Sequence, residues 1–221
     1  MKVIITGATG MVGKGVLLEC LDHPDVDEVL CISRRKLNIE HPKLKELIHL
    51  DFSEFESVSN KLEGFDACYA CMGVSSAGMA EEKYTELTYT YTLALAKTLL
   101  KLNKEFTFTY ISGQGTDSTE KGKSMWARVK GKTENDLLNL GFKQAFMFRP
   151  GGIIPKRGIE PSSKLYSILI KYLGWLIHII KYLAPNSIVD STQIGKAMIN
   201  ITQKGYPNKI INPKDILLLA E

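Results

Sequence analysis

The sequence predicts an α/β protein in which a doubly wound parallel sheet carries helices on both faces. Two observations predict this class. Short apolar runs alternate with helical stretches through residues 1–150, and a glycine-rich turn, TGATGMVG, follows the first apolar run directly. Strands separated by helices of this length form βαβ units, which need a parallel sheet with both faces covered.

The individual elements follow from runs of β-branched and aromatic residues and from helical periodicity. Strands are expected over residues 2–6, 27–33, 44–51, 65–73, 105–112 and 144–150. Helices are expected over residues 10–21, 79–101 and 124–140. Near the C-terminus we expect a further helix capped at Asp190 or Ser191, because their side chains can accept from the first helical turn. A short strand and a final turn should follow.

Three glycines form the turn after the first strand. Gly7, Gly10 and Gly13 have the spacing G-x-x-G-x-x-G and lead into the first helix. Such a turn lets the backbone approach a diphosphate, and the helix start offers free N–H groups and the positive end of its dipole. The pattern predicts a dinucleotide site. A tight turn that serves only helix packing is the alternative.

Basic residues end the second strand, in the stretch SRRK at residues 33–36. Enzymes that select NAD usually place an acidic residue here, whereas adjacent guanidinium groups suit a 2′-phosphate. Arg34 and Arg35 therefore favour NADP(H) over NAD(H), with a solvated basic loop as the alternative. Asp51, at the end of the third strand, is a candidate acceptor for the adenine amino group or else a cap.

The stretch DACYACMG holds a Cys-x-x-Cys pair, Cys68 and Cys71. The sequence offers no second such pair, so we predict no metal site. On a strand, residues three apart face opposite sides. We expect two buried apolar residues, with Cys71 near a ligand because it ends its strand.

Taken together, these stretches resemble the short-chain dehydrogenase/reductase superfamily, especially its atypical NAD(P)H-binding branch with the NmrA-like and Tat-interacting-protein-like oxidoreductases. The resembling stretches are TGATGMVG, SRR, CMG, YISGQGTD, WARVKGKTE and FRPGGIIPKRG, in this order over residues 2–160. The resemblance implies a Rossmann-type sheet with a dinucleotide across the carboxyl ends of the strands. We accordingly expect a single domain, with a dinucleotide-binding core over residues 1–150 and substrate-side elements over 151–221.

The resemblance also implies a role for each matching residue. The diphosphate would be held by Thr9, Gly10, Met11 and Val12. The 2′-phosphate would be held by Arg34 and Arg35, with Ser33 beside them as a further cofactor-binding residue, and the adenosine ribose side by Met72 and Gly73. Lys130 would bind the nicotinamide ribose. The nicotinamide would be covered by the stretch RPGG, residues 149–152, with Pro150, Gly151 and Gly152 as cofactor-binding residues, and Arg157 would reach the cofactor or substrate.

Proton transfer is where the sequence departs from that superfamily. Its chemistry uses a Ser or Thr after the fifth strand, a Tyr, and a Lys four residues beyond the Tyr, whose ammonium lowers the pKa of the phenol. Ser112 and Lys130 are present, but Trp126 occupies the Tyr position. An indole N–H only donates and has no accessible deprotonated form near neutral pH, so Trp126 is not a competent acid.

Other hydroxyl groups are candidates for the missing acid. Tyr84, Tyr89 and Tyr91 lie on a helix that we expect beside the nicotinamide, and Tyr91 matches a recurrent Tyr of the branch, although helix packing is the alternative. Two functions stay open. One is an NADP(H)-dependent oxidoreductase acting on a small, rather apolar carbonyl or hydroxyl compound; the other is a non-catalytic NADP(H)-sensing or protein-interaction module.

A nearly all-apolar helix is expected over residues 163–184. Its few polar residues share a sector of roughly 100°; they are Lys164, Ser167, Lys171, Gly174, His178 and Lys181. A surface helix normally has one apolar stripe, so this one should meet something besides its own sheet. The interrupting Lys and His residues argue against a transmembrane span. A lid over an apolar pocket, a homo-oligomer interface and association with a membrane surface stay open.

Composition limits the partners and the location. The 44% hydrophobic and 24% charged residues predict a folded chain rather than a disordered one. The net charge of +4 is too small and too dispersed to predict nucleic-acid binding. The N-terminal stretch turns glycine-rich after a few apolar residues, which predicts neither a signal peptide nor an anchor. We therefore expect a cytoplasmic protein.

Overall fold

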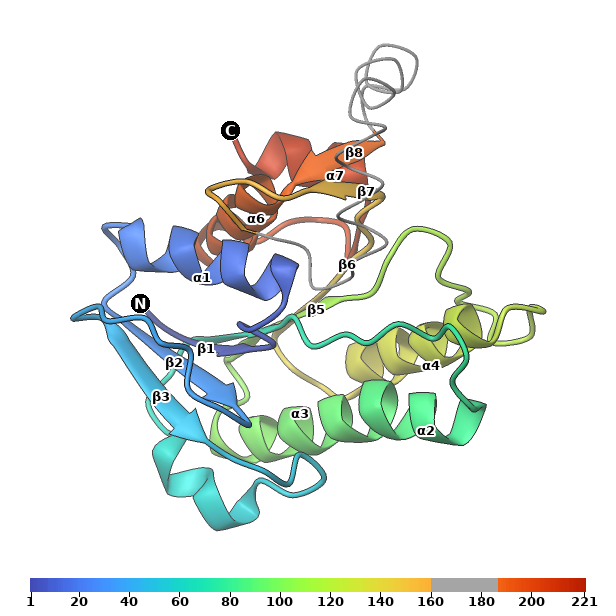
Figure 1. Cartoon of the computed structure of the whole chain (residues 1–221), viewed down its shortest axis with the longest axis horizontal. Helices are drawn as coiled ribbons and strands as arrows, with labels where there is room; N and C mark the ends of the chain where they lie inside the picture. The colour runs from blue at the N-terminus through green and yellow to red at the C-terminus, as the bar shows by residue number, and fades with distance from the viewer. Residues whose placement is uncertain (160–186) are drawn as a thin grey trace.

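A computed structural model of the chain describes residues 1–159 and 187–221. A seven-stranded parallel sheet forms its centre, with helices on both faces (Figure 1). The strand order is β3-β2-β1-β4-β5-β6-β9. The chain thus winds outward from β1 to β3, returns to the centre at β4 and winds outward the other way. This doubly wound arrangement confirms the predicted fold class.

All six strands expected before residue 151 are present. The strands of the sheet are β1 (Lys2–Thr6), β2 (Glu28–Ser33), β3 (Leu44–Ile48), β4 (Ala67–Ala70), β5 (Thr107–Ile111), β6 (Gln144–Phe148) and β9 (Ile210–Ile211). Several end before the predicted boundary, β3 at Ile48 and β4 at Ala70. The residues beyond these ends form loops at one edge of the sheet, and the loop after β4 lines the site described below.

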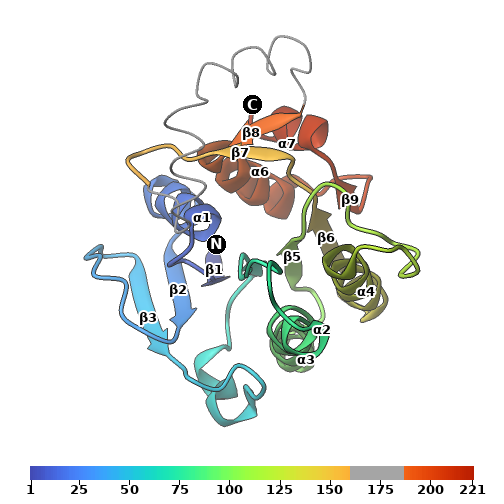
Figure 2. The ribbon, with the colours of Figure 1, turned by 45° about the vertical axis from the view of Figure 1, so that its right-hand side comes forward.

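The helices lie in two layers. They are α1 (Met11–Asp22), α2 (Glu81–Thr85), α3 (Tyr91–Leu102), α4 (Met125–Asn139), α6 (Ser191–Lys204) and α7 (Pro213–Leu219). Side chains from α1, α6 and α7 belong to the apolar core on one face of the sheet, and side chains from α3 and α4 to the core on the other. Figure 2 shows the sheet between these layers.

Two local helical features were not predicted. A 3₁₀ helix, η1 (Glu56–Lys61), follows β3. The helix expected over residues 79–101 is interrupted by a π-helical turn, η2 (Glu86–Thr90), between α2 and α3. The Tyr91 hydroxyl donates to the Glu86 carboxylate across this turn at 2.9 Å. Hydrophobic periodicity does not locate a single π turn, because five residues are too short a window to show a change of period.

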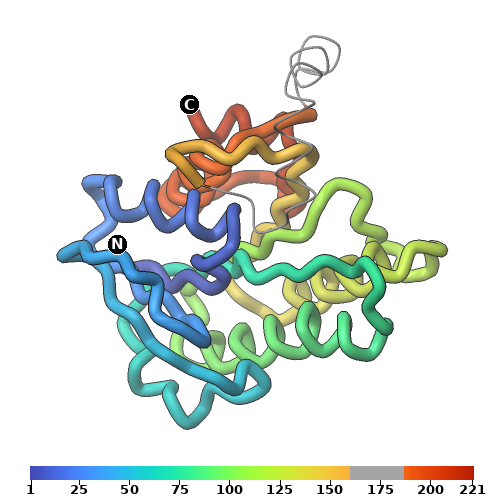
Figure 3. Tube along the Cα trace, in the orientation of Figure 1, coloured from blue at the N-terminus to red at the C-terminus, as the bar shows by residue number. Residues whose placement is uncertain are grey.

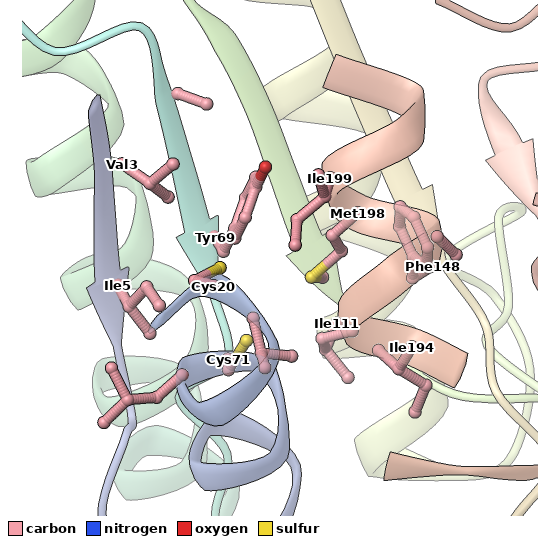
Figure 4. Close-up of a cluster of buried hydrophobic side chains, with 14 of the residues drawn as sticks. Val3, Ile5, Cys20, Tyr69, Cys71, Ile111, Phe148, Ile194, Met198 and Ile199 are labelled. Atoms are coloured by element: carbon pink, nitrogen blue, oxygen red, sulfur yellow. The ribbon is translucent and has the colours of Figure 1, made fainter. Parts of the chain in front are cut away.

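The core beneath α1 and α6 contains buried side chains from the central strands (Figure 4). Tyr69 extends from β4 towards α6, where its hydroxyl shares a hydrogen bond of 3.0 Å with Thr202. Cys71 belongs to this core, whereas Cys68 belongs to the core beneath α3. The two thiols are free and buried, on opposite sides of the sheet as predicted.

Helix α6, near the C-terminus of the sequence, packs directly against α1, near the N-terminus (Figure 3). Glycines allow this contact. A Cβ added to Gly15 would lie 2.5 Å from the Cβ of Ser191, and one added to Gly195 would lie 2.8 Å from the Cβ of Glu19. Since real Cβ atoms do not approach so closely, any larger residue would force the two helices apart.

The start of α6 confirms the predicted cap. The Asp190 carboxylate accepts from the backbone N–H groups of Thr192 and Gln193 at 3.0 and 2.8 Å. The Gln193 side chain accepts in return from the backbone N–H of Asp190 at 2.9 Å. This capping box gives a hydrogen-bond acceptor to the backbone N–H groups of Asp190, Thr192 and Gln193, which the helix itself leaves without one.

The C-terminal residues also complete the sheet. Strand β9 pairs with β6 in parallel, as the short strand expected there. The final segment is the helix α7 rather than the turn we expected, because Pro213 fits the first helical position and Asn212 caps it. The residues after 187 therefore build part of the core and an edge of the sheet.

A separate small sheet was missed. Strands β7 (Gly152–Ile154) and β8 (Ile188–Asp190) pair in parallel. Three-residue strands show no periodicity that a sequence can reveal. The apolar helix expected over residues 163–184 lies outside the described residues. Within the described ranges, no helix has the length and apolar character needed to cross a membrane.

Candidate functional site

A cavity of about 680 Å³ opens at the carboxyl ends of the central strands. It lies where the strand order reverses, between β1 and β4, the usual place for a ligand in an open α/β sheet. The glycine turn, the loops after β4, β5 and β6, and one side chain of α4 form its wall. The lining residues are Gly10, Met11, Val12, Cys71, Met72, Gly73, Ile111, Ser112, Gly113, Gln114, Gly115, Lys130, Pro150, Gly151 and Ile153.

A second cavity, of about 240 Å³, continues from the first towards the end of β2. The two share Gly10, Cys71, Met72 and Gly73. The remaining lining residues of the second cavity are Gly7, Thr9, Arg34, Arg35, Phe52, Val74, Leu87 and Tyr91. Together the cavities form an elongated site with Lys130 at one end and two arginines at the other.

The glycine turn closes against the end of β4. Gly7 has a φ of +74°, and a Cβ there would lie 2.6 Å from the carbonyl of Cys71. A Cβ on Gly13 would lie 2.2 Å from the carbonyl oxygen of Gly7. Among the described residues, no side chain caps α1 at Gly10. The N–H groups of the first turn therefore stay available to an anion in the cavity.

Arg34 and Arg35 both line the second cavity and are exposed. Within the described part of the chain, neither guanidinium group forms a salt bridge. Ser33 does not line either cavity. Its hydroxyl is turned to the backbone, where it donates to the carbonyl of Arg35 at 2.5 Å. Ser33 thus shapes the loop that carries the arginines rather than facing the site, which corrects the sequence prediction.

Asp51 acts as the cap that the sequence left as an alternative. Its carboxylate accepts from the backbone N–H of Ser53 at 2.9 Å and from the Ser53 hydroxyl at 2.5 Å. These hydrogen bonds lower the pKa of the Asp51 carboxyl. Its neighbour Phe52 lines the cavity instead, with its ring centroid 6.1 Å from that of Tyr91. Phe52 is a lining residue that the sequence did not indicate, and the adenine contact by Asp51 stays a prediction.

Lys130 is held at the floor of the larger cavity. Its Nζ donates to the backbone carbonyl of Ser112, at the end of β5. Burial lowers the pKa of Lys130 to about 8, against the opposing effect of the Glu134 carboxylate. The Ser112 hydroxyl is buried and donates to the carbonyl of Phe148 at 3.0 Å. The hydroxyl proton of Ser112 is therefore engaged with β6 rather than with a ligand.

Trp126 is absent from the described wall of the Lys130 cavity. Its ring lies instead against the loop after β5, where a Cβ on Gly115 would approach ring atom Cη2 to 3.4 Å. Gly115 has a φ of +88°, which favours glycine. Trp126 thus supports the loop that carries Gly113 and Gly115.

The alternative hydroxyl groups do not reach Lys130. Tyr91 lines only the second cavity, and its hydroxyl donates to Glu86. Tyr84 is buried in the core, and the Tyr89 hydroxyl donates to Asp136 at 2.7 Å. The first part of the interrupted helix packs against α4, where Tyr89 meets Asp136, and Tyr91 lies at the arginine end of the site. A catalytic role for Tyr91 is accordingly not supported.

Two further predicted contacts fall elsewhere. Arg157 forms ion pairs with Glu19 at 3.1 Å and with Asp22 at 2.7 Å, on α1. These carboxylates hold Arg157 away from the cavity, so the predicted approach to cofactor or substrate is wrong. Pro150 and Gly151 line the cavity as expected. Gly152 does not, because it begins strand β7.

A buried ion pair beside Lys130 was not predicted. Glu134 is fully buried, and the Arg149 Nε donates to its two carboxylate oxygens at 3.0 and 3.1 Å. The Arg149 Nη2 also donates to Glu134 and to the Ser118 hydroxyl. Sequence periodicity places Glu134 on the buried face of α4, but it does not identify a partner on β6. Arg149 thus binds Glu134 on α4 and does not line the cavity.

With this geometry established, comparison with known proteins identifies the family. A family model described as the NAD dependent epimerase/dehydratase family matches residues 3–120, more than half of the chain. The chain belongs to this family. Membership supports binding of a nicotinamide cofactor and confirms the predicted place among the short-chain dehydrogenase/reductase proteins. The matched range includes the glycine turn, both arginines and Ser112.

Individual known proteins are similar to this chain over most of its length. Protein FMP52, mitochondrial, from Candida albicans is 26% identical, covering 100% of this chain and 98% of the relative. Protein HTATIP2 from Rattus norvegicus is 27% identical, covering 71% of this chain and 64% of the relative. A solved UDP-N-acetylglucosamine 4-epimerase from Methanobrevibacter ruminantium is 17% identical with a TM-score of 0.69, covering 96% of this chain and 75% of that one. That structure supports the fold.

The names of the fungal relatives overturn one expectation. FMP52 is named as mitochondrial in Candida albicans, and further fungal relatives carry the same description. The expectation of a cytoplasmic protein is therefore wrong. The N-terminal pattern that led to it addresses only secretory signals and anchors, and it does not separate the cytosol from the interior of an organelle.

Proposed function

We propose that this protein is an NADP(H)-dependent oxidoreductase of the epimerase/dehydratase family that acts on a small, rather apolar carbonyl or hydroxyl compound. The observation that carries this proposal is the elongated site itself. A glycine turn with an open helix start lies at its centre. Two guanidinium groups without a salt bridge in the described residues lie at one end, and a desolvated ammonium group, Lys130, lies at the other.

The residues present fit the dinucleotide. The close approaches at Gly7 and Gly13 leave backbone rather than side chains facing the diphosphate position, with Thr9 and Met11 beside it. Arg34 and Arg35 would hold the 2′-phosphate, and Met72, Gly73 and Phe52 would surround the adenosine. Lys130 would bind the nicotinamide ribose, with Pro150 and Gly151 over the ring. The bound nicotinamide supplies or accepts the hydride.

The wall of the larger cavity supports an apolar substrate. Met11, Val12, Ile111 and Ile153 line it, together with Pro150. Ionisable groups in this wall are confined to Lys130 and Cys71 among the described residues. Such a surface favours an uncharged compound, because an ionised carboxylate or phosphate would lose its hydration with little compensation.

The decisive experiment measures NADPH oxidation over the blank with a panel of quinones, aldehydes and ketones. We expect slow turnover by the native protein, because Trp126 replaces the phenol that transfers the proton elsewhere in the superfamily. Restoring the phenol with Trp126→Tyr should raise turnover of the same compounds, and Trp126→Phe serves as the matched control. A panel without turnover in the native protein and in Trp126→Tyr would contradict the oxidoreductase.

A non-catalytic NADP(H)-sensing or protein-interaction module is the second candidate. The observation that favours it is the combination of Trp126 at the Tyr position with a Ser112 hydroxyl already bonded to Phe148. A sensor would bind NADPH tightly in a fluorescence titration and yet leave every panel compound unreduced. The two candidates share the cofactor site and differ only in the chemical step.

A further inference from the structure

The inference concerns the source of the substrate proton. Among the described residues, two titratable side chains line the larger cavity, Lys130 and Cys71. Burial raises the pKa of the Cys71 thiol, so this group does not release a proton at neutral pH. The Ser112 hydroxyl donates to Phe148, and Trp126 is absent from the described wall. Lys130 is the group in that wall that can exchange a proton.

The Lys130 ammonium has one bonded acceptor in the described structure, the carbonyl of Ser112. Its other protons are therefore available to a ligand in the cavity. A neutral amine can form here because burial disfavours the ammonium and the one carboxylate that would stabilise it is paired with another cation. Glu134 lies one helical turn further along α4, but its carboxylate is already bound by Arg149, the residue after β6. The thiol of Cys71, the residue after β4, is neutral and adds no charge to the surroundings of Lys130.

We propose that Lys130 itself donates the proton to the substrate oxygen, and that the Glu134–Arg149 ion pair keeps Lys130 able to release it. The inference rests on the proposed function, and it assigns to Lys130 a step that a Tyr performs elsewhere in the superfamily. Lys130 is then a catalytic residue. Glu134 and Arg149 are positioning residues that act through its charge.

The step balances in atoms and charge. As the carbonyl carbon accepts the hydride, the electron pair of the C=O π bond moves to the oxygen. The oxygen then bonds to a proton from Lys130 Nζ. The broken N–H bond leaves its electron pair on nitrogen, and the neutral amine takes a new proton from water. The product is an alcohol, and the reverse reaction begins from the neutral amine.

The protonation state sets the expected pH dependence. The pKa of Lys130 is lowered by burial to about 8, close enough to neutrality for efficient proton transfer in both directions. Reduction needs the ammonium, so its rate should be level at lower pH and fall as the pH rises through 8. Oxidation of the alcohol needs the amine, so its rate should rise through the same range.

Direct titration of Lys130 tests the inference without a substrate. NMR of the lysine side chains, assigned with Lys130→Met, should show one amine that titrates near 8. Arg149→Met should move this titration upward, because the freed Glu134 carboxylate would then favour the ammonium. The double variant Glu134→Gln/Arg149→Met removes both charges and should stay close to the native titration. A Lys130 that titrates like an exposed lysine overturns the inference, whatever the turnover.

Turnover of a panel compound provides the second arm. Lys130→Arg keeps the positive charge, but its guanidinium does not deprotonate in proteins. We expect NADPH affinity within a few-fold of native and a loss of about 10² to 10⁴ in turnover. The matched control is Lys132→Met. Lys132 lies two residues further along α4, where it forms an exposed ion pair with Asp136. Native turnover and pH profile in Lys130→Arg would overturn the donor role.

The two arms separate failure of the inference from failure of the proposed function. Turnover combined with an ordinary Lys130 titration overturns the inference alone. A lysine that titrates near 8 in a protein without turnover overturns the oxidoreductase, and the donor role with it.

Discussion

Lys130 donates from α4 to the backbone carbonyl of Ser112, not to its hydroxyl. The carbonyl at the end of β5 thus holds the ammonium in the cavity, while the hydroxyl of the same residue donates across to β6. Two groups that the superfamily pattern places in one catalytic set therefore have separate partners here. The Lys130 ammonium is therefore positioned by backbone, independently of the Ser112 hydroxyl.

Arg34→Ala tests the choice of cofactor. A hydrogen bond to a charged group contributes about 1.5–3 kcal/mol, so we expect NADPH to bind roughly 10- to 100-fold more weakly and NADH to be little affected. Fluorescence titration with each cofactor measures the two affinities. Lys61→Ala, an exposed cation absent from both cavity walls, is the control. Equal losses for NADPH and NADH would refute the 2′-phosphate assignment.

Gly13→Ala tests the close contact within the glycine turn. The added methyl group would meet the carbonyl oxygen of Gly7 at 2.2 Å. Because backbone must move to relieve this overlap, we expect a loss of about 1–3 kcal/mol in the free energy of unfolding and much weaker NADPH binding. Chemical denaturation and fluorescence titration measure the two effects.

The matched control is Gly73→Ala, since a Cβ at Gly73 has no neighbour within 4 Å. This variant should unfold at the native denaturant concentration. If both variants were equally stable, the close contact at Gly13 would have no energetic consequence.

Arg157→Ala tests the position that the structure gives to this residue. Its guanidinium pairs with Glu19 and Asp22 on α1 and is partly exposed, so the two ion pairs should contribute no more than about 1 kcal/mol. We expect a small fall in thermal stability and unchanged NADPH affinity. A marked loss of NADPH affinity would return Arg157 to the cofactor site.

Local sequence patterns were enough for the fold class and for the residues that line one end of the candidate site. Alternating apolar runs and helices revealed the six strands of the first 150 residues, and the cap at Asp190 was visible from its residue type. The glycine turn and the arginines after β2 are also local signals. In each case a few neighbouring residues define both the backbone conformation and the chemistry.

Contacts between distant residues could not be predicted in this way. Arg149 follows a strand and Glu134 lies in the middle of a helix, and only the packing of α4 beside β6 brings them together. For Arg157, the family resemblance predicted contact with the cofactor or substrate. In the structure its guanidinium instead pairs with two carboxylates of α1. The side chains of Asp51 and Ser33 form hydrogen bonds to residues two positions further along the chain, Ser53 and Arg35.

The sequence by itself determined the doubly wound sheet, the dinucleotide turn and the replacement of the expected Tyr by Trp126. These features depend on residue type and on spacing along the chain. The tertiary structure decided which groups share the cavity with Lys130 and how the charge of Glu134 is neutralised. Those features depend on burial and on partners from separate strands and helices, because desolvation and ion pairing act through space rather than along the chain.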